Sequence, residues 1–179
     1  MSLKGKKQAF KVARGEDGET TLQDYEITLD EGMVVLDCMH RIQHEKEPDM
    51  AVRWNCKAGK CGSCSAEING RPRLMCMTRM SDVVAETPKG QPIEIRPMKA
   101  FPHIKDLVTD VQWNYDIAQK IAPINGPKEM NWEFNQMEAD RVQHFRECIE
   151  CFLCCLLYTS DAADDSLRVD LGGRCIIKK

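Results

Sequence analysis

Apolar and polar residues alternate in several short segments of the first hundred residues, which is the pattern of half-buried β-strands. Turn-forming residues separate these segments: Gly15 to Gly18 follow the first one, and Asn69-Gly70 forms a two-residue hairpin signal inside a later one. The pattern predicts strands at 8–13, 22–29, 51–54, within 65–74, where the hairpin folds back, and at 92–97.

Elsewhere the apolar residues recur every three or four positions, which predicts helices. The first such stretch runs from Asp30 to Glu47, and the next runs from Ile104 to Ala118 and ends before Pro123. A loop over roughly 123–136 should precede a last helix from about Met137 to Cys148. The change from alternating to helical spacing lies near 98–104. It predicts an α+β fold with a β-rich domain at 1–100 and a helical part at 101–154.

Four cysteines in the β-rich part have the spacing of ligands to a plant-type [2Fe–2S] cluster. Three of them form a C-x4-C-x2-C run, and the fourth stands alone further on: Cys56, Cys61, Cys64 and Cys76. Gly59 and Gly62 allow the loop to curl so that backbone N–H groups point at the sulfurs. We therefore expect a [2Fe–2S] cluster at the edge of a β-grasp, ferredoxin-like domain.

The alternative reading of these four cysteines is a structural zinc site. Zinc ribbons place two short cysteine pairs on separate knuckles, whereas here three cysteines share one loop. The spacing favours a cluster of iron and sulfide. The alternative outside redox chemistry is a structural or interaction module stabilised by zinc.

A second cysteine run, Cys148, Cys151 and Cys154, has the C-x2-C-x2-C spacing that opens a bacterial-type [4Fe–4S] motif. The motif should continue to a fourth cysteine followed by proline, but Tyr158 stands at that position. Cys155 is a poor substitute because adjacent residues cannot easily reach two corners of one cubane. We expect a [4Fe–4S] site that lacks its fourth ligand.

Residues 155–179 are expected to be a non-native tail. Their sequence resembles a forward translation of the adapter used in transposon-based sequencing libraries, so they are left out of the fold prediction. On this interpretation the helical part is truncated after residue 154.

Composition narrows the class of protein. The formal net charge of −3 argues against a nucleic-acid partner, and no apolar run approaches the ~20 residues of a membrane span. The first residues do not form a signal peptide, so ten cysteines predict metal binding in a cytoplasmic protein more than disulfides.

Several polar residues near the first motif have two readings. Five cations surround it in sequence and are either a solvated face or stabilisers of a reduced, more negative cluster: Lys57, Lys60, Arg71, Arg73 and Arg79. His40 and His44 are expected on an exposed helix face, and Cys38 in the core.

Taken together, residues 7–154 resemble the iron–sulfur subunit of succinate dehydrogenase/fumarate reductase. The resemblance is carried by the stretches 53–64, 69–78, 101–115 and 148–154. It implies an N-terminal [2Fe–2S] domain and the start of an α-helical ferredoxin domain, which in the family normally carries one [4Fe–4S] and one [3Fe–4S] cluster. The ligands of the [3Fe–4S] cluster are missing from this sequence.

The resemblance also implies a function and partners. The chain would relay electrons, without catalytic residues of its own, between the FAD of a flavoprotein subunit and a quinone bound by a membrane anchor (succinate + quinone = fumarate + quinol). It would lie peripherally on the cytoplasmic face of the inner membrane, held there by its complex. A free-standing [2Fe–2S] ferredoxin, or a subunit of another oxidoreductase, is the alternative within redox chemistry.

Overall fold

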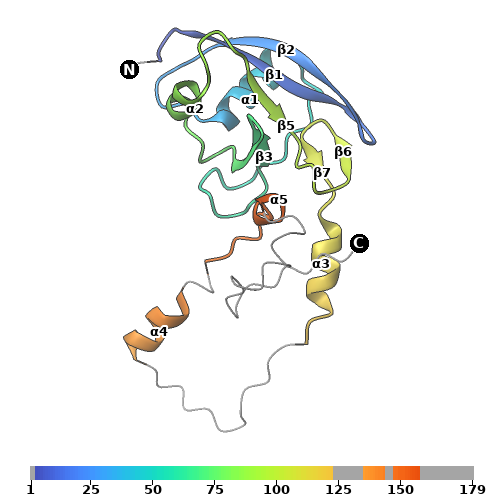
Figure 1. Cartoon of the computed structure of the whole chain (residues 1–179), viewed down its shortest axis with the longest axis vertical. Helices are drawn as coiled ribbons and strands as arrows, with labels where there is room; N and C mark the ends of the chain where they lie inside the picture. The colour runs from blue at the N-terminus through green and yellow to red at the C-terminus, as the bar shows by residue number, and fades with distance from the viewer. Residues whose placement is uncertain (1–2, 123–134, 144–146, 158–179) are drawn as a thin grey trace.

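The computed structural model describes residues 3–122, 135–143 and 147–157. Most of the expected loop at 123–136 and residues 158–179 of the expected tail lie outside these ranges. Within the described part, a mixed sheet with helices forms the body of the molecule, α3 and α4 extend away from it, and α5 lies against one end of it (Figure 1). The α+β prediction is confirmed.

The long hairpin of β1 (Lys7–Glu16) and β2 (Glu19–Thr28) organises the sheet. β1 pairs in parallel with β5 (Ile93–Arg96), which pairs in turn with β3 (Ser65–Ile68) and then β4 (Arg71–Leu74). Asn69 and Gly70 have φ values of 49° and 73°, the left-handed geometry of a two-residue hairpin turn. The strands expected at 8–13, 22–29, 65–74 and 92–97 are therefore confirmed.

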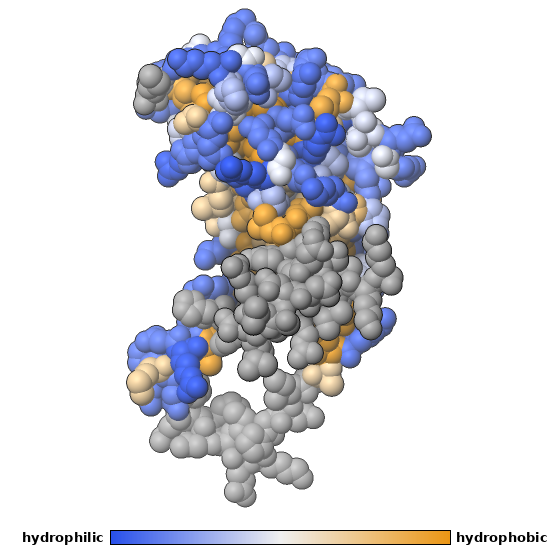
Figure 2. Space-filling view, viewed as in Figure 1, coloured by the Kyte–Doolittle hydropathy of each residue, from blue (hydrophilic) through white to orange (hydrophobic). Residues whose placement is uncertain are grey.

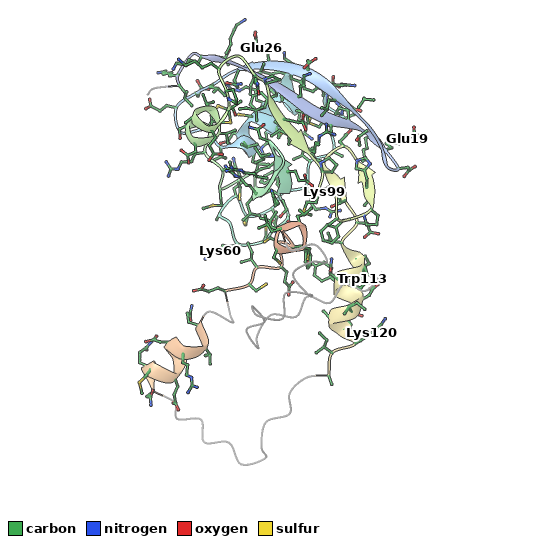
Figure 3. All side chains as sticks on the ribbon, viewed as in Figure 1. Glu19, Glu26, Lys60, Lys99, Trp113 and Lys120 are labelled. Carbon is green, nitrogen blue, oxygen red and sulfur yellow. The ribbon has the colours of Figure 1, made fainter. Side chains whose placement is uncertain are left out.

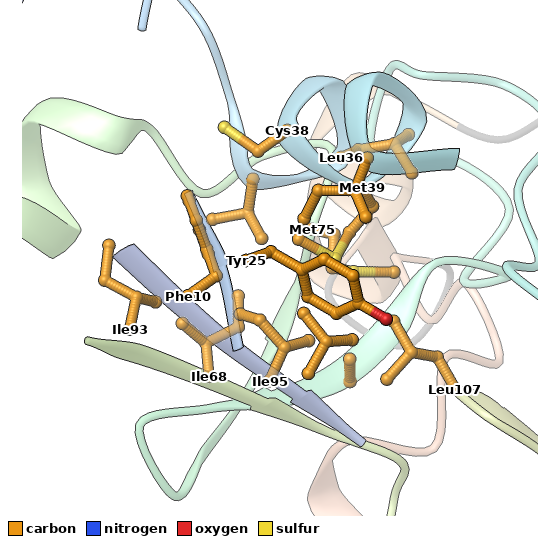
Figure 4. Packing of buried hydrophobic residues seen from close by; sticks show 14 of the residues in the cluster. Phe10, Tyr25, Leu36, Cys38, Met39, Ile68, Met75, Ile93, Ile95 and Leu107 are labelled. Carbon is orange, nitrogen blue, oxygen red and sulfur yellow. The ribbon is translucent and has the colours of Figure 1, made fainter. Parts of the chain in front are cut away.

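The helix α1 (Val35–Glu45) lies across the sheet and buries its apolar face on it. Figure 4 shows Leu36 and Met39 of the helix in one packed cluster with Phe10, Ile68 and Ile95 of the strands. All five side chains are almost fully buried, so this contact forms the core of the domain. The helix begins later than its predicted start at Asp30, because residues 31–32 form a turn. A second short helix, α2 (Met80–Glu86), was not predicted.

Two sequence predictions are wrong in this region. Residues 51–54 form no strand, because Ala51 bonds instead to the side chain of Asp106 and to the backbone of Leu107. Residues 104–109 are not helical: β6 (His103–Lys105) and β7 (Val108–Thr109) form a hairpin that pairs with the end of β1. The sheet thus reaches beyond the expected boundary at 100, and the division into domains stays a prediction.

The buried guanidinium of Arg14 explains the hairpin at 103–109. It donates to Asp106 Oδ1 and Asp49 Oδ2, both at 2.9 Å, and pairs with Glu47 at the same distance. Asp106 is 1% exposed and also accepts the amides of Gly15 and Ala51. These bonds hold Asp106 in a tight turn with φ 49°, which interrupts any helix there.

In the part of the chain after residue 100, the first helix is α3 (Gln112–Gln119), where Asp110 Oδ1 accepts the amide of Gln112 at 2.8 Å. α4 (Gln136–Gln143) confirms the start of the last expected helix, but residues 147–150 are not helical, so Cys148 does not lie on it. α5 (Cys154–Leu157) is a single turn. Within the described residues, no helix is long and apolar enough to span a bilayer.

Polar side chains cover most of the face of the body shown in Figure 2, and apolar residues gather at the end where α3 begins and α5 lies. That end carries the cysteine-rich segments. It contains a loop of residues 54–64, called here the cysteine loop, and the second cysteine segment, residues 147–157.

Candidate iron–sulfur site

The cysteine loop contains three residues in left-handed backbone conformation. Lys57, Gly59 and Gly62 have φ values of 52°, 64° and 69°. The residues that follow the first two, Ala58 and Lys60, donate their backbone N–H groups to Cys56 Sγ, each at 3.3 Å. Alternation of right- and left-handed residues turns successive N–H groups toward one side, the geometry that binds anionic groups in iron–sulfur sites. The loop therefore directs two backbone N–H donors at the sulfur of Cys56.

Cys64 and Cys76 lie beside one another at the open end of the β3–β4 hairpin. Antiparallel pairing of β3 with β4 continues outward, with the Met75 amide bonded to Cys64 O at 3.0 Å. The next amide, that of Cys76, donates to Cys64 Sγ at 3.4 Å. The returning strand thus places Cys76 beside Cys64, and its role as a ligand stays a prediction.

The four thiols interact in two pairs, Cys56 with Cys61 and Cys64 with Cys76. Their environments differ. Hydrogen bonds from Ser63 and Cys56 lower the pKa of Cys61 to about 6, whereas burial raises the pKa of Cys64 to about 12. Cys64 and Cys76 are buried, and the other two are half-buried. The site thus has a wetter half on the loop and a drier half on the hairpin.

The arrangement of the four thiols in two pairs helps to distinguish a zinc site from an iron–sulfur cluster site. In the part of the chain that the structure describes, no three Cys, His, Asp or Glu side chains converge closely enough to hold one metal ion. A zinc ion needs three or four ligands at one centre, whereas a two-iron cluster divides four thiolates between its irons. Four thiols in two pairs, with backbone N–H donors on Cys56 Sγ and on Cys64 Sγ, fit the second arrangement.

The second cysteine segment packs directly against the cysteine loop. A Cβ added at Gly62 would lie 2.6 Å from Cys151 Cα, so only glycine permits this approach. The Ser65 hydroxyl lies 2.8 Å from Gly62 O and 3.0 Å from Cys151 O, and so bridges the two segments. The structure therefore brings together two motifs that are far apart in sequence.

Aromatic contacts hold the second segment in place. The ring of Phe152 lies 6.0 Å from that of Phe101 and 5.7 Å, edge-on, from that of Tyr115 on α3. Glu150 and Phe152 have φ values of 54° and 57°, which is costly for residues with a Cβ. Cys148 and Cys154 are exposed and Cys151 is half-buried, so this run does not close around a common centre in the described residues.

Most of the other polar side chains singled out near the first motif make contacts that stabilise the described part of the fold. Lys57 is ion-paired with Asp37, and Arg71 and Arg73 both pair with Glu86. His40 packs on Trp54, and burial lowers the pKa of its ring. Lys60 lies at the outer edge of the cysteine loop (Figure 3).

Sequence reasoning missed three residues of this site: Ser63, Ser65 and Asp37. Each acts through a contact made by folding. Ser63 and Ser65 stand beside the cysteines, and their hydroxyls are the local signal that could have drawn attention to them. Nothing near Asp37 in sequence indicates its partner twenty residues away.

Comparison with known proteins agrees with this site. Residues 8–116 match the family model described as "2Fe-2S iron-sulfur cluster binding domain". The fumarate reductase iron-sulfur subunit of Mycobacterium tuberculosis is 33% identical over an alignment of 153 residues that covers 79% of this chain and 59% of that one. The mitochondrial succinate dehydrogenase [ubiquinone] iron-sulfur subunit 1 of Oryza sativa is 32% identical over 140 residues, covering 74% and 48%.

A solved structure is also similar: a chain of the Mycobacterium smegmatis Sdh1 complex in the apo form, with 49% identity and a TM-score of 0.76 over 83% of this chain and 62% of that one. The present chain thus spans about half to three fifths of the length of the curated relatives named above. It belongs to the 2Fe-2S iron-sulfur cluster binding domain family, and within it is related to the iron–sulfur subunits of succinate dehydrogenase and fumarate reductase.

Proposed function

We propose that this chain is a one-electron carrier with two neighbouring cluster sites. Cys56, Cys61, Cys64 and Cys76 would hold a [2Fe–2S] cluster. Three more cysteines, Cys148, Cys151 and Cys154, would be ligands of a second cluster, of the [4Fe–4S] type. The observation that carries the proposal is the direct packing of the second cysteine segment on the cysteine loop at Gly62 and Ser65.

When bound, an iron–sulfur cluster supplies reversible one-electron chemistry. The residues of this chain provide the conditions for it. The amides of Ala58 and Lys60 donate to Cys56 Sγ and offset the negative charge of the thiolates. The buried hairpin side at Cys64 and Cys76 keeps water from half of the site. The close approach at Gly62 shortens the path from one motif to the next.

We further propose that the relay runs between the FAD of a flavoprotein subunit and a quinone bound by a membrane anchor subunit. The support is the relationship to iron–sulfur subunits of succinate dehydrogenase and fumarate reductase. The chain would then take part in succinate + quinone = fumarate + quinol and reach the membrane through these partners. Tyr158 stands where the [4Fe–4S] motif requires a fourth cysteine, so the complete relay includes ligands that this sequence does not contain.

The test is anaerobic reconstitution of the full chain with iron and sulfide, followed by visible absorption and electron paramagnetic resonance after reduction. A rhombic signal from a reduced [2Fe–2S] centre, lost in Cys76→Ser, is the expected result. Cys38→Ala is the matched control, because Cys38 is fully buried on α1 and is not one of the proposed ligands. A colourless, zinc-loaded protein would contradict the proposal and favour the zinc-stabilised module.

Co-purification distinguishes a subunit of the proposed complex from a free-standing ferredoxin. A subunit of the proposed complex should bring down an FAD-containing flavoprotein, whereas a free-standing ferredoxin should not. The same experiment with Gly62→Ala would show whether the packing of the second segment is needed for assembly.

A further inference from the structure

The first two turns of α1 contact the cysteine loop on both sides of Cys56. Asp37 Oδ1 accepts a hydrogen bond from Lys57 Nζ at 2.8 Å, and Lys57 directly follows Cys56. Three residues further along the helix, the ring of His40 lies 4.8 Å from that of Trp54, which precedes Cys56 by two residues. The two contacts therefore bracket the first cysteine of the motif.

The same part of α1 also holds the segment that carries Cys76. The amide of Val35 donates to Thr78 O at 2.9 Å, and the amide of Leu36 donates to Met75 O at 3.1 Å. These two carbonyls lie on either side of Cys76. One stretch of helix, residues 35–40, thus touches the neighbours of both Cys56 and Cys76, and so determines how far apart the loop and the hairpin lie.

Asp37 is the centre of this arrangement because its carboxylate serves both sides. Oδ1 binds Lys57, while Oδ2 accepts the amide of Val34 at 3.1 Å and fixes the start of the helix. Burial works against ionisation, but the hydrogen bonds from Lys57 and Val34 outweigh it and lower the pKa of Asp37. Lys57 has φ 52°, a conformation that disfavours any side chain, so an anchored lysine helps to maintain the loop geometry.

We propose that Asp37 is a positioning residue for the first cluster site: it clamps the Cys56 side of the cysteine loop to the helix that holds the Cys76 segment, and it neutralises the cation beside Cys56. The inference rests on the proposed function in that the four cysteines bind a [2Fe–2S] cluster. Loss of the Asp37 charge leaves the Lys57 ammonium uncompensated. An uncompensated cation favours the reduced state, which is more negative by one charge.

The experiment measures the midpoint potential of the reconstituted full chain by redox titration followed with electron paramagnetic resonance. Asp37→Asn keeps an oxygen for the Val34 amide but removes the charge. At the wild-type midpoint we expect the reduced-to-oxidised ratio to rise about tenfold, equivalent to +59 mV for a one-electron couple. Lys57→Gln should shift the midpoint the other way, and the double variant should lie near wild type.

Glu26→Gln is the matched control. It breaks an ion pair of the same 2.8 Å length, Lys7–Glu26, on the β1–β2 hairpin away from the cysteine loop. Its midpoint and line shape should equal those of wild type. A broadened signal in Asp37→Asn, restored in Asp37→Glu, would show that the carboxylate also orders the loop.

The proposal is overturned if Asp37→Asn assembles the cluster with unchanged midpoint and line shape. Failure of the wild-type chain to assemble any cluster would instead contradict the proposed function. The clamp is then tested in the cluster-free chain by limited proteolysis within residues 54–64. Faster cleavage in Asp37→Asn than in Glu26→Gln supports the clamp, and equal rates refute it.

Discussion

Replacing Gly62 by alanine should separate the two cysteine segments while the sheet and α1 stay folded. The added Cβ would lie 2.6 Å from Cys151 Cα and 2.9 Å from Cys151 N, and backbone atoms cannot give way as a flexible side chain can. Since the second segment meets the body through few contacts, we expect that segment to move, with little change in the cysteine loop.

The magnitude follows from the contacts that would be lost. The hydrogen bond between Ser65 and Cys151 O contributes about 1 kcal/mol. The two ring contacts of Phe152 contribute about 0.5–1.5 kcal/mol each. Docking of the second segment should therefore weaken by about 2–4 kcal/mol, which corresponds to a roughly 30- to 1,000-fold increase in its open population.

A second, separate cost arises from the backbone. Gly62 has φ 69°, and an alanine in this region costs about 1–2 kcal/mol wherever it occurs. Gly70→Ala is the matched control, because Gly70 has φ 73° and a Cβ added there would have no atom within 4 Å. Both variants should lose similar global stability in urea titrations, and only Gly62→Ala should free the second segment.

Hydrogen exchange measured on peptides from 147–157 separates these effects. The amides of Cys155 and Leu156 donate hydrogen bonds to Phe152 O and Leu153 O. They should exchange much faster than in wild type in Gly62→Ala, and at the wild-type rate in Gly70→Ala. Equal exchange in the two variants would refute the reasoning. The contact between the motifs would then be absent in solution, and the observation that carries the proposed relay would be withdrawn.

Two further predictions concern the thiols and the buried ion network. In the cluster-free chain, hydrogen bonds lower the pKa of Cys61 to about 6, and burial raises the pKa of Cys64 to about 12. At pH 7 iodoacetamide should therefore alkylate Cys61 before Cys64, because the thiolate is the form that reacts. The rate at Cys61 should rise with pH and reach half its maximum near pH 6; equal labelling of both thiols would contradict this. Arg14→Met leaves the carboxylate of Asp106 buried without its cation and should lower the free energy of unfolding by about 3–5 kcal/mol in urea titrations. Lys7→Met, which breaks an exposed pair, should change it little, and a similar loss in both variants would show that burial does not matter here.

The parts of the fold that could be predicted are those with local signals. Alternating residues and a tight turn mark β1, β2 and the β3–β4 hairpin within the segments themselves. The spacing of cysteines within about twenty residues likewise predicts a [2Fe–2S] domain, and the family model agrees with this. In each of these cases neighbours in sequence are also neighbours in space.

The failed predictions concern segments whose structure depends on distant partners. Apolar residues from Ile104 onward have helical spacing, yet Leu107 and Thr109 are equally well buried by a hairpin. The choice is made by Arg14, whose guanidinium binds Asp106 across 92 positions of sequence. A buried cation requires its counter-ion nearby, and this requirement outweighs a weak helical periodicity.

The same distinction applies within the site. Cysteine spacing predicts which atoms bind iron, but the relative placement of those atoms depends on residues with no such signature. Asp37 connects the Cys56 side of the loop to α1, and Ser65 connects the loop to the second segment. Both do so with a single short polar side chain at the boundary between two segments. Substitutions at these two positions would leave the cysteine motifs intact in sequence and alter how the two proposed cluster sites are held.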